Sequence, residues 1–190
     1  IFLREGVSFE SNHKTILFSE ALFNKLTSMT SPDGIGAVVR KKSYMDIKSD
    51  KILLLDGIND PGNIGTMIRS AEAFGFRDII LTRGTVDPYN EKSLRASMGS
   101  AFRLNIVEKT YEDISKLKDS YKILAADMDG VDVRDYKKDL KIILAIGNEG
   151  NGLSEEIRDL TDQFVKIPME GEIESLNAAI AASIIMNRLM

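Results

Sequence analysis

The fold is decided by residues 51–82, which read KILLLDGINDPGNIGTMIRSAEAFGFRDIILT. Residues 51–56 are a short apolar run, which predicts a buried strand. Residues 63–74 place apolar side chains three and four positions apart, which predicts a helix, and residues 78–82 predict a second strand. This alternation of strand and helix predicts an α/β fold with a mostly parallel sheet that is covered on both faces.

The same alternation continues towards the carboxyl end of the chain. Further strands are predicted at residues 103–107, 122–126, 141–146 and 164–167. Further helices are predicted at residues 90–98, 111–118, 154–160 and 176–190. A smaller strand, helix and strand unit is predicted before them, at residues 15–18, 19–29 and 35–39, followed by a polar linker at residues 43–50.

Composition excludes several classes of protein. The chain has 190 residues, of which 43% are hydrophobic, so it can bury a core and is not disordered. It has no Cys, which fits a reducing cytoplasm, and its single histidine, His13, excludes a His-based metal centre and a Ser-His-Asp triad. We therefore expect a cytoplasmic protein with no metal. No apolar run is long enough to span a membrane.

The net charge of the chain is only weak evidence about its binding partners. The net charge of −4 is unusual for a dedicated nucleic-acid binder, but local basic groups remain at residues 40–42 and at Arg69, Arg77 and Arg95. Because the chain begins at Ile1 and not at Met, we expect it to be a fragment of a longer protein.

Three polar segments follow or adjoin predicted strands. They cover residues 59–69, 146–153 and 167–177, and each is dense in Gly, Pro or Asn. In α/β proteins, ligand sites form where polar loops leave the ends of the strands. We therefore expect the three segments to meet at one site.

The glycines of the second segment do not form a dinucleotide-binding loop. Gly147, Gly150 and Gly152 give a GxxGxG spacing in place of GxGxxG, which argues against a nicotinamide oxidoreductase. The segment also lacks the lysine of a phosphate-binding P-loop. A plain strand-to-helix turn capped by Ser154 is one interpretation. Glu149 favours a functional one, because a carboxylate among glycines has no packing role.

The polar residues of the other two segments also allow structural interpretations. Asn63 and Arg69 are six residues apart, about 240° around an ideal helix, so they do not share a face. Taken alone, Arg69 is more consistent with a solvated surface position. Ser175 and Asn177 stand at the start of the last predicted helix, where Ser175 would be a simple cap.

Together the segments strongly resemble the three signature motifs of the SpoU (TrmH-like) RNA methyltransferases of the SPOUT superfamily. Residues 60–75, DPGNIGTMIRSAEAFG, resemble DPxNxGxxxRxAxAFG. Residues 147–153, GNEGNGL, resemble GxEGxGL, and residues 167–181, IPMEGEIESLNAAIA, resemble IPMxGxxxSLNxxxA. The resemblance covers residues 51–190 and includes the connecting stretch 95–102. Each motif is weak alone, but chance does not readily produce three in order.

The resemblance implies an α/β fold with a C-terminal trefoil knot, a homodimer, and S-adenosylmethionine bound in the knot. It implies an RNA substrate-binding domain, present in part at residues 1–47, and a methyltransferase domain at residues 48–190. The implied catalytic set is Arg69, Asn63, Glu149, Ser175 and Asn177. The implied cofactor-binding set is Gly147, Ile167 and Leu176, with Ile146 and Met169 beside them.

The implied reaction is methyl transfer from S-adenosylmethionine to a ribose 2′-hydroxyl of structured RNA, either ribosomal or transfer RNA. A guanidinium is a poor base, so we expect Arg69 to hold a phosphate and stabilise the developing alkoxide. Two alternatives remain open: a non-catalytic RNA-binding or assembly module with the same fold, and methylation of a base nitrogen.

Overall fold

The chain forms two compact units, Ile1–Ser43 and Tyr44–Met190. The computed structural model describes residues 1–41, 45–137 and 140–190, so Lys42 of the basic group lies outside the described residues. The division between the units falls four residues before the expected boundary at residue 47. The reason is that residues 45–49 are hydrogen-bonded to the larger unit, through Asp78 and Asn105.

The smaller unit is a three-stranded sheet of order β2-β1-β3 with one helix. β1 is parallel to β2 and antiparallel to β3. The elements are β1 (Phe2–Arg4), β2 (Ile16–Phe18), α1 (Glu20–Lys25) and β3 (Ile35–Gly36). The sequence did not predict β1, and it predicted a longer α1 and β3. The unit is stabilised by ring contacts of Phe2 with Phe18 and Phe23, at centroid distances of 5.9 and 5.7 Å.

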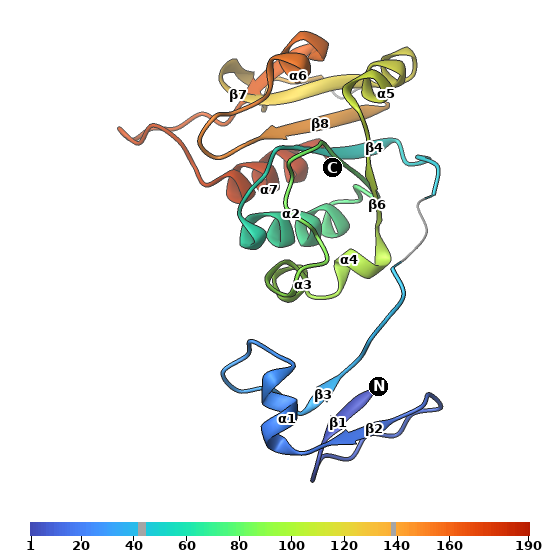
Figure 1. Ribbon diagram of the computed structural model, residues 1–190. Helices are drawn as coiled ribbons and strands as arrows, with labels where there is room; N and C mark the ends of the chain where they lie inside the picture. Colours follow the sequence, from blue (N-terminus) through green and yellow to red (C-terminus); the bar gives the residue numbers. More distant parts are fainter. Residues whose placement is uncertain (42–44, 138–139) are drawn as a thin grey trace. The chain divides into compact units, whose positions relative to one another are not determined.

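The larger unit contains a six-stranded sheet of order β6-β5-β4-β8-β7-β9 (Figure 1). All of its strand pairs are parallel, which confirms the predicted class. The strands are β4 (Lys51–Asp56), β5 (Asp78–Leu81), β6 (Asn105–Glu108), β7 (Lys122–Asp132), β8 (Ile142–Gly147) and β9 (Gln163–Lys166). The helices are α2 (Pro61–Ala73), α3 (Glu91–Ser97), α4 (Ser100–Arg103), α5 (Tyr111–Ser115), the 3-10 turn η1 (Lys116–Asp119), α6 (Glu155–Leu160) and α7 (Ala178–Leu189).

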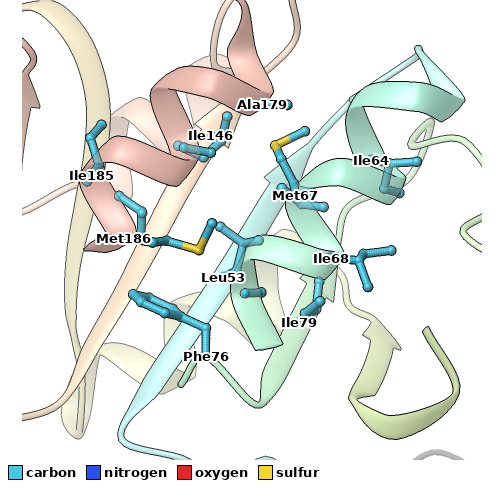
Figure 2. Close-up of a cluster of buried hydrophobic side chains, with 14 of the residues drawn as sticks. Leu53, Ile64, Met67, Ile68, Phe76, Ile79, Ile146, Ala179, Ile185 and Met186 are labelled. Carbon is cyan, nitrogen blue, oxygen red and sulfur yellow. The ribbon is translucent and has the colours of Figure 1, made fainter. Parts of the chain in front are cut away.

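Helices cover both faces of this sheet. Leu53 and Leu55 of β4 belong to a core cluster with side chains of α2 and α7, whereas Ile52 and Leu54 belong to a second cluster with α5 and α6. Figure 2 shows the first cluster, in which Met67 of α2 and the helix α7 pack over β4. Because successive strand residues face opposite layers, burial of both faces explains the unbroken apolar run in β4.

Several element ends differ from the sequence prediction for local reasons. α2 begins at Pro61, because the Asp60 side chain accepts a hydrogen bond from the Asn63 amide at 2.8 Å and proline suits the first helical position. β7 continues to Asp132, past an irregularity between Ala126 and Val131, because its second half pairs with β9. The strand expected from residue 103 begins at Asn105, because α4 occupies the preceding residues.

Asp78 clamps the start of the larger unit to the sheet. Its carboxylate is only 4% exposed and accepts hydrogen bonds from the Ser49 amide and hydroxyl, both at 2.7 Å, and from Asn105 Nδ2 at 2.6 Å. The Lys48 amide donates a further bond at 3.0 Å. Burial favours the neutral acid, but the donated hydrogen bonds outweigh it and lower the pKa of Asp78 below its ordinary value of 3.8.

Replacing Asp78 with asparagine is expected to lower the free energy of unfolding by about 2 kcal/mol at neutral pH, because an amide leaves buried donors unpaired. A lowered pKa stabilises the fold above the ordinary value, and this contribution is lost as the pH falls through the lowered one. Urea unfolding of both proteins should show the difference shrinking between about pH 6 and about pH 3. An equal difference at both pH values would contradict this role.

Candidate active site

A pocket of about 780 Å³ lies where the connections leave β8 and β9. Figure 1 shows the connections that leave β8 and enter α7 on the same side of the sheet. All five predicted cofactor residues line the pocket: Ile146, Gly147, Ile167, Met169 and Leu176. Glu149, Ser175 and Asn177 of the predicted catalytic set line it as well. The second and third polar segments therefore do converge.

A chain of side-chain hydrogen bonds joins the first segment to the other two. Asn63 Nδ2 donates to Glu149 Oε1 at 2.8 Å, and Asn177 Nδ2 donates to Asn63 Oδ1 at 3.0 Å. The Asn59 amide approaches Glu149 Oε2 at 3.5 Å. Asn63 thus sits between an acceptor and a donor, which fixes its carboxamide. The Glu149 carboxylate also lies at the amino-terminal end of α2, where the helix dipole favours negative charge.

Asn177, and not Ser175, caps the last helix. Its Oδ1 accepts hydrogen bonds from the amides of Ala179 at 2.9 Å and Ile180 at 3.2 Å, so α7 begins at Ala178. The prediction of a helix from residue 176 with Ser175 as cap was therefore wrong. One carboxamide serves both purposes, because its oxygen caps α7 while its nitrogen reaches Asn63. Ser175 is left exposed at the pocket.

The glycines of the 147–153 loop permit close contacts of the backbone. Paired backbone hydrogen bonds join Asn148 and Gly152 at 2.8 and 2.9 Å. A Cβ atom on Gly147 would lie 2.3 Å from the Gly152 carbonyl carbon and 2.4 Å from the Leu153 nitrogen. Gly152 has a φ of +70°, a conformation that favours glycine. The GxxGxG spacing therefore produces a tight turn with Glu149 near its tip.

Asn148 is a structural residue of this loop that the sequence reasoning missed. Its Oδ1 accepts hydrogen bonds from the amides of Gly150 at 2.9 Å and Asn151 at 3.0 Å. Its Nδ2 donates to the carbonyl of Gly57 at 2.8 Å. Its position before Gly residues in a predicted turn was the available signal, because Asn side chains commonly bond the backbone of turns.

The wall formed by Asp127 and Met128 was also missed. Asp127 pairs with Arg158 at 2.7 Å and accepts a hydrogen bond from the Asp129 amide at 3.0 Å. Burial raises the pKa of Asp127, but these donors outweigh it and hold the pKa below its ordinary value. The pocket therefore has a carboxylate on this wall, as it has Glu149 on another. The sequence carried no signal for Asp127, because the extension of β7 past residue 126 was not predicted.

Arg69 does not reach this pocket within one chain. It is exposed on α2 and is absent from the pocket lining. In the described part of the chain, its side chain forms no hydrogen bond or ion pair. Thr66 and Ala73 are exposed on the same helix, whereas Asn63 points to α7. The two predicted catalytic residues of the first motif thus lie on different sides of α2, as their spacing predicted.

Metal binding and membrane insertion can also be assessed from the described residues. Among residues 1–41, 45–137 and 140–190, no group of three or more His, Cys, Asp or Glu side chains is arranged to hold a metal ion. Over the same residues, no helix combines the length and the apolar content required to cross a bilayer.

Known proteins match this chain over most of its length. A model of the SpoU rRNA Methylase family matches residues 50–187. The chain is 33% identical over 183 residues to the 23S rRNA (guanosine(2553)-2′-O)-methyltransferase RlmP of Bacillus subtilis strain 168, with 95% of this chain and 74% of that protein aligned.

Solved structures match closely as well. The SpoU methyltransferase AviRb from Streptomyces viridochromogenes superposes with a TM-score of 0.87 at 31% identity, covering 99% of this chain and 79% of AviRb. The structure of AviRb in complex with the cofactor AdoMet gives a TM-score of 0.82 at 28% identity, covering 99% and 80% of the two chains. As its three motifs predicted, the chain belongs to the SpoU rRNA methylase family of RNA methyltransferases.

Proposed function

We propose that this chain transfers a methyl group from S-adenosylmethionine to a ribose 2′-hydroxyl of structured RNA, either ribosomal or transfer RNA. The observation that carries the proposal is the bonded contact of Asn63 with Glu149 and Asn177 beside the pocket, which unites the three motifs. The Bacillus relative, whose name gives a 2′-O-methyltransferase of 23S rRNA, supports the ribose as acceptor.

The pocket fits the cofactor in size and chemistry. Its volume of about 780 Å³ lies in the range of small-molecule sites. Ile146, Ile167 and Leu176 offer apolar surface for the adenine, and a cofactor without phosphate needs no cationic cradle. Asp127 is already paired with Arg158, whereas Glu149 has no ion pair in the described part of the chain and favours a cationic ligand over an anionic one. When bound, the cofactor supplies an activated methyl group on a positively charged sulfur.

The residues of the chain then have to position and activate a weak nucleophile. A ribose hydroxyl is little ionised at neutral pH, so charge that develops on its oxygen needs stabilisation. The guanidinium of Arg69 can hold a phosphate with two parallel hydrogen bonds and stabilise that charge. The proton of the ribose hydroxyl leaves to water or to a neighbouring group. Asn63, held by Glu149 and Asn177, and Ser175 orient the nucleotide or the cofactor tail.

We propose that the active form is a homodimer in which Arg69 of the partner subunit completes the site. Within one chain, Arg69 is exposed on the outer side of α2 and does not line the pocket. Ser70 of α2 is bonded to Ser183 of α7 at 2.8 Å, so the exposed sides of these helices adjoin. Ile180 and Ile184 of α7 are 53% and 40% exposed there, as an apolar contact between subunits requires. A monomer at micromolar concentration in sedimentation would contradict this proposal.

Two further features of the family are proposed for this chain. Residues 1–47 are proposed to form part of an RNA substrate-binding domain in which Arg40 and Lys41 contact phosphates. The affinity for RNA should then fall as the salt concentration rises. Alanine at both positions should reduce the dependence of RNA affinity on salt concentration; an unchanged dependence would refute the contact.

The C-terminal segment is proposed to thread a loop as a trefoil knot, and a crystal structure with an unknotted backbone would refute that.

The decisive experiment incubates the protein with labelled S-adenosylmethionine and total RNA, and analyses the digested nucleosides by mass. A labelled 2′-O-methylnucleoside is the expected product. A methylated base would instead establish a base methyltransferase. If no label is transferred and calorimetry detects no binding of S-adenosylmethionine, the chain is an RNA-binding module and the proposal fails.

Glu149→Gln is expected to lower kcat about 10-fold while the fold is retained. The amide keeps one acceptor for Asn63 Nδ2 but loses the charge and places a donor near the Asn59 amide. The matched control is Glu155→Gln, an exposed carboxylate in the first turn of α6. Single-turnover rates at saturating cofactor compare the two variants. Equal rates for both would show that the Glu149 contact has no functional role.

A further inference from the structure

A buried carboxylate without a cationic partner lies directly behind the site. Asp56, the last residue of β4, is 3% exposed, and no ion pair to it occurs in the described part of the chain. Its Oδ2 accepts hydrogen bonds from the amide and the hydroxyl of Ser154, both at 2.7 Å, and its Oδ1 accepts one from Thr82 Oγ1 at 2.8 Å. Burial of an unpaired carboxylate is costly unless such donors surround it.

These bonds tie together three connections at the carboxyl edge of the sheet. Asp56 ends β4, Thr82 follows β5, and Ser154 precedes α6 at the end of the loop that leaves β8. The neighbouring Gly57 adds to the junction. Its amide donates to Thr82 Oγ1 at 3.1 Å and its carbonyl accepts from Asn148 Nδ2 at 2.8 Å. The 147–153 loop is therefore held to residues 56 and 57 near both of its ends.

The bonds of Asp56 affect the position of Glu149, a predicted catalytic residue, through the backbone of the 147–153 loop. Glu149 is exposed, so its position depends on the two ends of the loop as well as on its contacts with Asn63 and Asn59. If Ser154 were released, the loop would keep its attachment at Asn148 but lose the one at its other end, and the 2.8 Å bond to Asn63 would have to hold Glu149 in a less constrained loop. A displacement of about 1 Å is enough to impair positioning catalysis strongly.

We propose that Asp56 is a positioning residue of the methyl-transfer site, which holds the 147–153 loop through Ser154 and Thr82 so that Glu149 meets Asn63. Asp56 does not line the pocket, so its role is to position the residues that do. The inference rests on the proposed function for its kinetic consequence, and on the hydrogen bonds alone for its structural one.

The test compares Asp56→Asn with Asp78→Asn. Both carboxylates are buried, accept several hydrogen bonds and form no ion pair within the described residues, but Asp78 lies at the opposite end of the sheet. Both variants are measured where circular dichroism shows them folded. Asp56→Asn is expected to lower kcat on the order of 10-fold or more. Amides 148–154 should exchange with deuterium about 10-fold faster in this variant. Asp78→Asn should keep the wild-type kcat and leave that exchange unchanged.

Two outcomes overturn the proposal: equal kcat and equal exchange of residues 148–154 in both variants, or an Asp56→Asn protein with wild-type values of both. If Asp56→Asn does not fold, Thr82→Val and Thr82→Ser replace it. Valine removes the hydroxyl that donates to Asp56, and serine retains it, so only valine should speed the exchange. Should the wild type transfer no methyl group, the proposed function fails, while exchange in the free protein still decides the role of Asp56.

Discussion

Gly147→Ala is expected to lose most of its affinity for S-adenosylmethionine. A Cβ atom at this position would lie between 2.3 and 2.5 Å from backbone atoms of Gly152 and Leu153. Backbone cannot move aside as a flexible side chain can, so the 147–153 loop has to open. Overpacking of this kind costs about 1–3 kcal/mol. Because Gly147 lines the pocket, we expect the Kd for the cofactor to rise roughly 10-fold or more.

The loop offers its own control. A Cβ atom on Gly150 would have only an ordinary contact, 3.6 Å from Asn148 Oδ1. Gly150→Ala should therefore bind the cofactor with nearly wild-type affinity. Calorimetric titration of both variants, with thermal unfolding to verify that each is folded, measures the difference. Tight binding by Gly147→Ala would show that the loop is free to open and that the close contact has no importance for the site.

Arg69→Ala is expected to reduce kcat by about 10²–10³-fold while cofactor binding is unchanged. The magnitude is typical for loss of a group that stabilises developing negative charge. Arg69→Lys keeps the charge but loses the planar arrangement of donors, so we expect most of the same loss. Methyl transfer and RNA affinity are measured separately. If Arg69→Lys retained full turnover and unchanged RNA affinity, the proposed role would be wrong.

Mixing two impaired variants tests which subunit supplies Arg69. In a mixed dimer of Arg69→Ala and Glu149→Gln chains, the first chain has an intact pocket and the second an intact arginine. If Arg69 acts across the interface, one complete site forms and about a quarter of wild-type turnover returns after random exchange of subunits. If it acts within its own chain, no site is complete and nothing beyond the residual activity of each parent is recovered.

Much of the fold was predictable because strong local signals agreed with it. The continuous apolar run of β4 and the helical spacing in α2 survive in the structure with small shifts, since both elements are buried by neighbours on several sides. The failures occurred where a distant partner decides an element. The second half of β7 exists because it pairs with β9, and β1 depends on pairing with β2 and β3. Local pattern contains no information about such partners.

The candidate site was also predictable only in part, and for the same reason. The motifs identified Asn63, Glu149 and Asn177 by residue type and order, but not the bonds between them. The residues that support them, Asn148 and Asp56, went unnoticed, because their importance lies in contacts across 91 and 98 positions of the chain. For Arg69, the helical angle from Asn63 correctly excluded a shared face.

The sequence alone therefore determined the α/β class and the family, and it supplied the residues that are predicted to carry the chemistry, because each is expressed in local periodicity or in short motifs. Only the tertiary structure decided that Asn177 caps α7 while it reaches Asn63, that Gly147 leaves no room for a side chain, and that Arg69 faces away from the pocket of its own chain. These are properties of atoms brought together from distant parts of the chain, and such distances are fixed by packing.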